Sequence, residues 1–302
     1  MRFPGWWLLL PLAGLVELGA QLRCHGAAPG PEAWAELGRK LGPRGADPSL
    51  VLVEPAWAEP MARAALDASW WPREQLGRPE DVGFASALQL LSPVSTARVP
   101  AGWELLSEQP VGQFRLRRLR ALTPVRERYD VVAAFTPSGA RATWLPAAHE
   151  AEPCVWTEHA QPITGGLGGS PALPSSRLLC DGAALARTLI DDPTFAARDC
   201  LWVTVPKGGS LLLEFPMAQL GERLVGHLGA PWLTHRDDDS PPLEVLVEID
   251  GRERGRLRYR GVEGWSRFEL ALGGTERTGT LGFRFTPNPG GSRQVCLQAV
   301  IR

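Results

Sequence analysis

The sequence is poor in lysine and tyrosine and carries almost no net charge. Only Lys40 and Lys207 are lysines among the 32 basic residues, and there are 2 tyrosines. The heavy use of Arg, Ala, Gly, Leu and Pro suggests a GC-rich coding sequence, so the arginine excess by itself indicates no function. With a formal net charge of -1, no overall field draws nucleic acid or an anionic membrane to the protein. We expect no nucleic-acid partner.

Motifs of several enzyme classes are also missing. There is no C-x-x-C pair, so neither a redox motif nor a zinc knuckle is indicated. The stretch 168–172 (GGSPA) lacks the last glycine of a serine-nucleophile elbow. The Gly-rich segment 163–176 lacks the Lys-Ser/Thr of a phosphate loop, and the ten-residue spacing of His149 and His159 matches no helical metal site. No catalytic residue is assigned, and a non-catalytic protein is favoured over an enzyme.

The composition predicts a folded protein. The chain has 302 residues, of which 44% are hydrophobic and 22% charged, enough for one large domain or two ordinary ones with a real core. No internal repeat is present.

Residues 1–23 are predicted to be a signal peptide or a membrane anchor. Arg2 supplies a positive charge, an apolar run extends from Trp6 to Val16, and Ala20 is a small residue at a cleavage point. This is the signal-peptide pattern, and the run is short for a membrane span. Cleavage, retention as an anchor and burial as a helix all stay open. A lipid anchor at Cys24 is disfavoured because the bulky Arg23 precedes it. We expect export, to the periplasm or to the outer face of the inner membrane.

Cysteine use agrees with export. Besides Cys24 there are four cysteines, which allow two bridges in three connectivities. We predict Cys200–Cys296, because Cys200 leads into one predicted strand and Cys296 lies in the last. Cys154–Cys180 would then close the Gly-rich segment. Buried free thiols are the alternative.

Residues 24–122 are predicted to form a small α/β domain. Pro31 opens a short helix. The further elements are a buried strand over 49–53, an Ala-rich helix over 59–69, and strands over 85–91 and 114–119. Helix–strand–helix–strand order favours a parallel strand pair. The arginines at 115, 117, 118 and 120 could meet phosphates or anionic lipid, but are more simply the wet face of an edge strand.

The helix with Trp34, the run SLVLVEP over 49–55 and the elements after it resemble one part of a known family. This is the soluble region that follows the membrane spans of bacterial dolichyl-phosphate-mannose-type glycosyltransferases. The resemblance covers roughly residues 30–120. The catalytic acidic residues of that family lie in its membrane part, so none is carried over. The resemblance implies a membrane glycosyltransferase as a partner.

Residues 123–302 are predicted to form an antiparallel β-sandwich with a jelly-roll-like arrangement, which makes the whole chain α+β. The predicted strands cover 129–135, 140–145, 201–205, 210–215, 223–227, 243–249, 255–259, 265–272, 278–285 and 293–301. Turn signals such as Asp250-Gly251 separate them. Apolar residues alternate with polar ones over 243–249 and 281–285, which predicts one buried and one wet face.

The run 245–272 (VLVEIDGRERGRLRYRGVEGWSRFELAL) resembles the galactose-binding-like jelly-roll modules of carbohydrate-active proteins. The matching features are its IDG hairpin, which ends at Gly251, and the Gly264-Trp265 strand. This resemblance implies a glycan ligand.

The segment 232–239 (WLTHRDDD) holds the candidate ligand-binding residues, which are Trp232, His235, Arg236, Asp237 and Asp238. It joins two predicted strands, and loops on such scaffolds are where ligands bind. An indole can stack on a sugar ring, the polar groups can bond its hydroxyls, and clustered Asp could hold Ca²⁺. No other cofactor is expected. The alternative is a solvated acidic loop with Trp232 in the core. Trp202 and Trp265 lie in predicted strands and are expected to be core residues.

These patterns favour an exported, non-catalytic accessory protein of the cell envelope that binds glycan through its sandwich. Two alternatives stay open: an envelope glycan-modifying enzyme with a site between the domains, and a purely structural protein–protein module. An enzyme requires paired carboxylates with shifted pKa values or a His dyad, whereas a glycan binder requires an accessible Trp.

Overall fold

The computed structural model describes Gly14 and residues 28–45, 49–71, 83–165, 171–191, 197–230, 242–260, 264–274, 276–287 and 293–302. Apart from Gly14, the predicted targeting segment and Cys24 lie outside these residues. None of the described helices is long and apolar enough to cross a membrane. The chain divides into two compact units. We call the unit of residues up to Gln75 and Phe84–Pro124 the N-terminal unit, and that of Leu76–Gly83 and Val125–Arg302 the sandwich unit.

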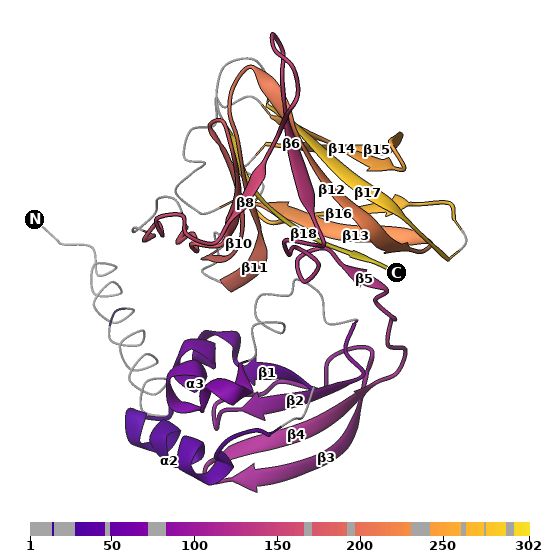
Figure 1. The fold of residues 1–302 in the computed structure, drawn as a ribbon. Helices are drawn as coiled ribbons and strands as arrows, with labels where there is room; N and C mark the ends of the chain where they lie inside the picture. Colours follow the sequence, from indigo (N-terminus) through magenta and orange to yellow (C-terminus); the bar gives the residue numbers. More distant parts are fainter. Residues whose placement is uncertain are drawn as a thin grey trace, which may run out of the picture. The chain divides into compact units, whose positions relative to one another are not determined.

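The N-terminal unit is a four-stranded sheet with helices packed on it (Figure 1). Its elements are α2 (Pro31–Leu41), β1 (Leu50–Glu54), η2 (Ala56–Ala58), α3 (Glu59–Ala65), η3 (Ala68–Trp70), β2 (Ser86–Leu91), β3 (Trp103–Val111) and β4 (Phe114–Ala121). The strand order is β1-β2-β4-β3, in which only β1 and β2 are parallel. The predicted parallel pair is confirmed, and the sheet is mixed rather than parallel throughout.

Helix α2 begins and ends at residues that favour such boundaries. Pro31 stands in its first turn, and Gly42 follows its end with φ 57°, a conformation that suits glycine. Trp34 and Leu37 are buried and join α3 and the sheet in one apolar cluster. The helix predicted over 59–69 is wrong in its second half, because α3 ends at Ala65.

A local side-chain hydrogen bond explains that early end. The Asp67 carboxylate accepts the Ser69 N–H at 2.8 Å and caps the turn η3. Such bonds offer the backbone an alternative to continuing the helix.

The sequence predicts that the arginine-rich strand is an edge strand, and this prediction is wrong. Strand β4 lies between β2 and β3, so the edge strand on this side is β3, which the sequence pattern missed. Polar residues and Pro110 interrupt the apolar alternation of β3. On β4, Arg115 and Arg117 pair with Glu108, so these arginines belong to a cross-strand ion-pair network.

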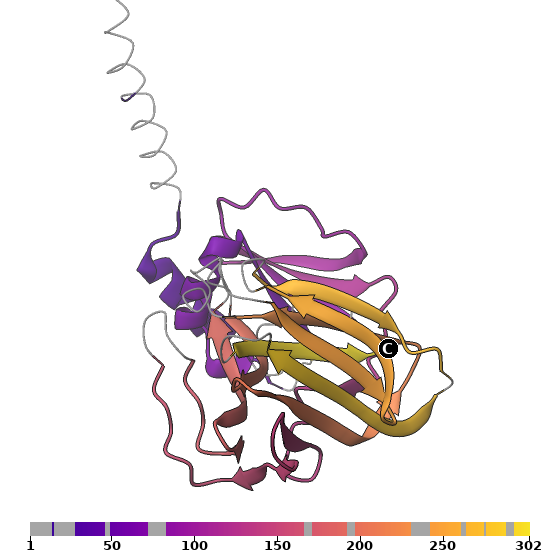
Figure 2. The same ribbon diagram turned by 90° about the horizontal axis from the view of Figure 1, so that it is seen from above.

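The sandwich unit consists of two antiparallel sheets (Figures 1 and 2). We call the eight-stranded one, in the order β16-β13-β18-β11-β10-β9-β8 with β5 beside β18, sheet I. The six-stranded one, in the order β15-β14-β17-β12-β6-β7, is sheet II. The strands of sheet I are β5 (Tyr129–Asp130), β8 (Val155–Thr157), β9 (Arg177–Cys180), β10 (Ala183–Asp191), β11 (Ala197–Val205), β13 (Arg223–Gly229), β16 (Ser266–Ala271) and β18 (Arg293–Ile301). Those of sheet II are β6 (Arg141–Pro146), β7 (Glu152–Pro153), β12 (Gly209–Leu220), β14 (Leu243–Ile249), β15 (Arg252–Tyr259) and β17 (Arg277–Pro287).

The core lies between the two sheets and follows the predicted alternation. Alternate residues of β14, from Leu243 to Ile249, are buried in it, as are Phe283 and Phe285 of β17. The Asp250-Gly251 turn between β14 and β15 has φ values of 50° and 72°. This left-handed pair is what tight hairpins require and what Asp-Gly supplies. The predicted β-sandwich is confirmed.

One predicted strand of this unit is wrong, and several real ones were missed. Of the strand predicted over 129–135 only β5 forms, because the Asp130 carboxylate accepts the N–H groups of Val132 and Ala133 and turns the chain. The pattern also missed β7 to β10. Strand β10 carries Arg187 and Thr188 in its middle, which hides its alternation.

Both predicted disulfides form. Cys200 and Cys296 are fully buried on the neighbouring strands β11 and β18, with Cα atoms 5.6 Å apart. Cys154 and Cys180 have Cα atoms 4.5 Å apart, and they link the connection between β7 and β8 to the end of β9. The free-thiol alternative is therefore wrong. Bridges of this kind are typical of proteins that fold in oxidising compartments.

Candidate functional site

The predicted ligand-binding residues Trp232, His235, Arg236, Asp237 and Asp238 lie outside the described residues. The structure gives the strands on either side of their segment. Strand β13 ends at Gly229 in sheet I, and β14 begins at Leu243 in sheet II. The segment therefore joins two strands, as the sequence predicts, and the structure adds that these strands belong to different sheets; the role of the segment stays a prediction.

An aromatic cluster lies directly beside the end of β13. The Trp265 ring, just before β16, lies so close to Gly229 that a Cβ added there would be 1.7 Å from its Cε3. The His227 imidazole stacks on the indole, with centroids 6.1 Å apart and planes 8° from parallel. The Arg198 guanidinium carbon is 6.0 Å from the ring centroid. We call Trp265, His227 and Arg198 the Trp265 cluster.

This cluster lies on the outer face of sheet I. Leu228 of β13 points into the core, and His227 beside it in the strand points the other way. Trp265 itself is only partly buried, yet its indole N–H is enclosed and has no hydrogen-bond partner among the residues that the structure describes. The sequence assigned Trp265 to the core and did not single out His227.

Next to the cluster, the outer face of sheet I is apolar and covered. Trp202, Ile190 and the Cys200–Cys296 bridge form a second hydrophobic cluster with Leu173. Leu173 belongs to the Gly-rich segment and exchanges two backbone hydrogen bonds with Ile163. The core position predicted for Trp202 is confirmed at 1% exposure.

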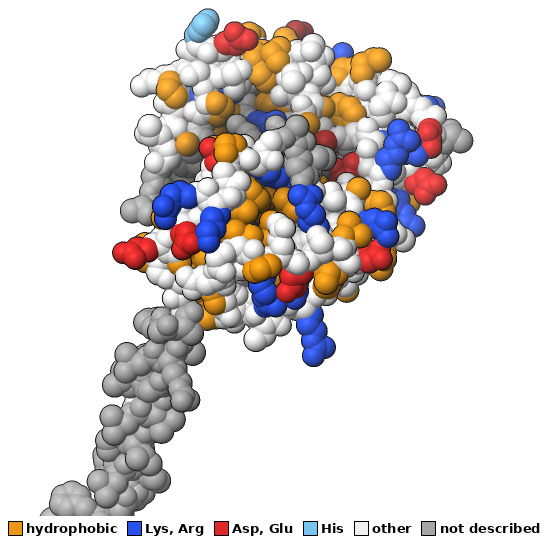
Figure 3. Space-filling model, turned by 90° about the horizontal axis from the view of Figure 1, so that it is seen from below, with side chains coloured by type: hydrophobic (Ala, Val, Ile, Leu, Met, Phe, Trp, Pro, Cys, Tyr) orange, Lys and Arg blue, Asp and Glu red, His pale blue; other side chains and the backbone are white. Residues whose placement is uncertain are grey.

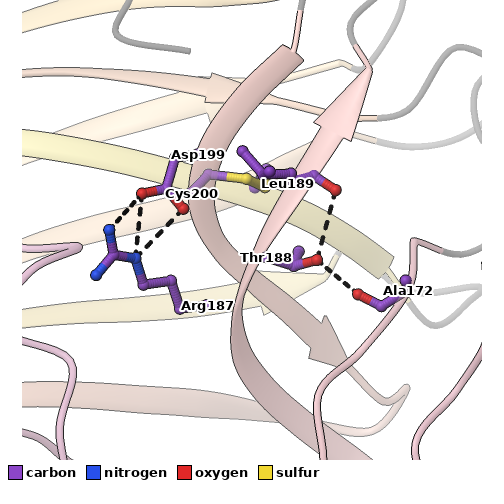
Figure 4. The surroundings of a disulfide bond; sticks show 7 residues. Ala172, Arg187, Thr188, Leu189, Asp199 and Cys200 are labelled. Atoms are coloured by element: carbon purple, nitrogen blue, oxygen red, sulfur yellow. Dashed lines mark hydrogen bonds and ion pairs between the residues drawn. A yellow bond between two sulfur atoms is a disulfide. The ribbon is translucent and has the colours of Figure 1, made fainter. Parts of the chain in front are cut away.

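Polar contacts frame this bridge (Figure 4). The Thr188 hydroxyl donates to the carbonyl of Ala172, and Arg187 bonds both carboxylate oxygens of Asp199. Arg187 and Asp199 form a paired, largely buried ion bridge. A buried charge that is paired in this way serves the structure without needing a ligand.

The outer face of sheet II carries charged pairs in regular order. Arg284 pairs with Glu248 at 2.9 Å and Arg141 with Glu214 at 3.0 Å. Farther along the face, the hydroxyls of Ser210 and Thr286 lie 2.8 Å apart. On the face shown in Figure 3, positively and negatively charged side chains are likewise mixed, with apolar side chains between them.

Shifted carboxyl groups in the described part of the chain all favour the charged form. The pKa is lowered for Glu36, Asp67, Glu108, Asp250 and Glu269, and the largest cause in each case is a hydrogen bond. A general acid requires a raised carboxyl pKa, so these five groups are ion-pair and turn residues.

Metal ligands do not gather among the residues that the structure describes. In those ranges no group of three or more His, Cys, Asp or Glu side chains could hold an ion. His149 and His159 lie within them. The Asp residues considered for Ca²⁺ lie outside them.

Comparisons with known proteins give slight likenesses only. No family model and no curated protein matches the chain, so nothing there supports the glycosyltransferase resemblance of residues 30–120. Similar solved structures include CBM51 from Clostridium perfringens GH95 with methyl-galactose, at 6% identity and a TM-score of 0.26 over 38% of this chain and 80% of that one. A second is CBM51-2 with GlcNAc and INT domains of Clostridium perfringens ZmpB, at 6% identity and a TM-score of 0.30 over 70% of this chain and 43% of that one. A third concerns carbohydrate-binding modules of the β-sandwich superfamily, at 9% identity and a TM-score of 0.32 over 66% of this chain and 71% of that one.

The chain thus spans less than half of the second of these structures. Likenesses this slight give no evidence about the ligand. Evidence about the ligand has to come from the geometry of the chain itself.

Proposed function

We propose that the protein is an exported, non-catalytic accessory protein of the cell envelope whose sandwich unit binds glycan. The observation that carries this proposal is the Trp265 cluster on the outer face of sheet I. Sugar recognition combines an aromatic surface for the apolar side of the ring with donors and acceptors for its hydroxyls. The partly buried indole supplies the aromatic surface, and the Arg198 guanidinium beside it carries N–H donors for hydroxyl groups.

The predicted loop extends this site in the proposal. Its segment begins at Trp232, three residues after Gly229, against which the Trp265 ring lies. Of the Trp265 cluster, His227 lies closest in the chain to the candidate residues, which are Trp232, His235, Arg236, Asp237 and Asp238. A second aromatic ring and further polar groups would enlarge a site that already has one of each.

Export rests on two supports, the apolar run at Trp6–Val16 and the two disulfides. A fusion of residues 1–30 to a reporter that is active only outside the cytoplasm tests it. We expect an active fusion; an inactive one retained in the cytoplasm contradicts export. The membrane glycosyltransferase partner has only the sequence resemblance behind it and is left out of the proposal.

Glycan binding is tested with a panel of immobilised polysaccharides and the purified full chain. The test variant is Trp265→Ala, and the control is Trp57→Ala, because Trp57 is 54% exposed in the N-terminal unit. Removing a central aromatic side chain costs on the order of 2 kcal/mol of binding, roughly a thirtyfold loss of affinity. We expect that loss for Trp265→Ala and none for Trp57→Ala.

Three outcomes would count against the proposal. Equal binding by Trp265→Ala would mean that the site lies elsewhere. Turnover of a polysaccharide would favour the enzyme alternative, and no binding to any polysaccharide would favour the structural module. Trp265→Phe, which keeps an aromatic ring, separates loss of the site from loss of the fold.

A further inference from the structure

The outer face of sheet II forms a second ordered surface. We call Glu214, Gly282, Glu248, Leu212, Arg284 and Leu246 the ionic face. Glu214, Gly282 and Glu248 lie opposite one another on β12, β17 and β14. Leu212, Arg284 and Leu246 form the next row on the same strands. Residues two apart in a strand share a face, and the residues between them point into the core.

The charged groups of the ionic face are held in place. The Nε of Arg284 donates to Oε1 of Glu248 at 2.9 Å, and the Glu248 side chain is only 10% exposed. The Nε of Arg141 donates to Oε2 of Glu214 at 3.0 Å. Charge-assisted bonds of this kind fix both partners, so a ligand would meet groups that are already ordered.

Gly282 leaves a gap between the two carboxylates. A Cβ added there would lie 3.4 Å from Cβ of Glu248, 3.6 Å from Cδ1 of Leu212 and 3.8 Å from Oε2 of Glu248. These are ordinary contact distances, so the gap can take a methyl group without displacing its neighbours. Its sides are an acidic oxygen and an aliphatic side chain.

The charge balance indicates what kind of ligand fits. Each carboxylate of the ionic face is neutralised by a guanidinium group, that of Arg141 for Glu214 and that of Arg284 for Glu248, and Arg284 is still 33% exposed. A hydroxyl group can donate to a carboxylate and accept from a guanidinium. The carboxylates of Glu214 and Glu248 would repel a polyanion, and the guanidinium groups of Arg141 and Arg284 would repel a cation. Leu212 and Leu246 on either side of Arg284 offer apolar contact.

We infer that the ionic face binds a neutral glycan chain, with one hydroxyl entering the gap at Gly282. This inference rests on the proposed glycan-binding function and names its ligand class. It also adds a surface, because sheets I and II pack with their inner faces together and their outer faces turn away from each other. The Trp265 cluster and the ionic face are therefore separate contacts.

The test uses the full chain in affinity electrophoresis with neutral polysaccharides (mannan, galactan and glucan) and with the anionic polygalacturonate. Gly282→Ala fills the gap with a methyl group. Gly274→Ala is the matched control, since a Cβ at Gly274 meets nothing closer than 3.9 Å. Glu248→Gln, which keeps the side-chain shape, is a second variant in case Gly282→Ala does not fold.

We expect a neutral polysaccharide to bind, with about tenfold weaker binding for Gly282→Ala and for Glu248→Gln, the loss typical of breaking a hydrogen bond to a charged group. Gly274→Ala should bind like the original chain. If a polysaccharide binds and Trp265→Ala weakens it while both ionic-face variants leave it unchanged, the inference is overturned and the proposed function stands. Tighter binding of polygalacturonate than of the neutral chains also overturns it. If the original chain binds nothing, both fall together.

Discussion

The two disulfides differ enough in loop length and burial to give a quantitative prediction about stability. Cys200–Cys296 closes a separation of 96 residues and Cys154–Cys180 one of 26. In the chain-entropy account, bridges of these lengths contribute about 4.7 and about 3.5 kcal/mol respectively. Cys200 and Cys296 are also fully buried, so replacing them leaves a cavity that adds to the loss.

The assay compares two double variants, Cys200→Ala/Cys296→Ala and Cys154→Ala/Cys180→Ala, by urea denaturation under non-reducing conditions. We expect the first to lose at least about 1 kcal/mol more free energy of unfolding than the second. Mild reduction of the original chain, followed by alkylation and peptide mass analysis, should label the partly buried Cys154 and Cys180 first. Equal losses, or prior labelling of Cys200 and Cys296, would refute the reasoning.

Two further predictions concern packing and pH. Trp202→Ala should lower the free energy of unfolding, measured in urea, by about 3–5 kcal/mol, because the side chain is 1% exposed. Met217→Ala, at 69% exposure, should lower it by less than about 0.5 kcal/mol. Similar losses for the two variants would contradict the described burial. The N–H of Thr280 and then Arg277 lower the pKa of Asp250, so this group stabilises the fold above its unfolded pKa and the contribution is lost as pH falls through the folded value. Thermal melts should therefore show a smaller loss of stability on acidification for Asp250→Asn than for the original chain, and identical pH profiles would argue against that role.

Alternation and turn chemistry made much of the sandwich predictable. The positions from Leu243 to Ile249 and the pair Phe283 and Phe285 alternate with polar residues, and both sets are buried as expected. The Asp250-Gly251 turn has the left-handed backbone that its sequence requires. Both signals are local, so they need no knowledge of the rest of the chain.

Strands without such a signal were missed. Strand β10 accommodates Arg187 and Thr188 because each has a hydrogen-bond partner. Arg187 bonds Asp199 on the neighbouring strand, and the Thr188 hydroxyl donates to the carbonyl of Ala172 in the covering segment. Strand β3 carries Pro110 because it is an edge strand. In both cases the residue is explained by a neighbour far away in the sequence.

For the candidate site, too, the sequence indicated the residue with a local signal and missed the contacts made between strands. Trp265 stands out in the sequence as an aromatic residue beside a glycine, but a strand residue of this kind can point to either face. Its stacking on His227 depends on the pairing of β13 with β16, and the gap at Gly282 depends on Glu214 and Glu248 meeting in register across three strands.

The sequence by itself determined the elements whose cause is local, which are the alternating strands, the glycine turns and the helix that Pro31 opens. For the four cysteines it left three connectivities and free thiols open, and the pairing that we predicted from it is the one that forms. Only the tertiary structure decided which strand is at an edge, which outer face is covered and which side chains meet across strands. Those outcomes depend on strand order and register, and both arise from contacts between residues distant in the chain, which no local pattern encodes.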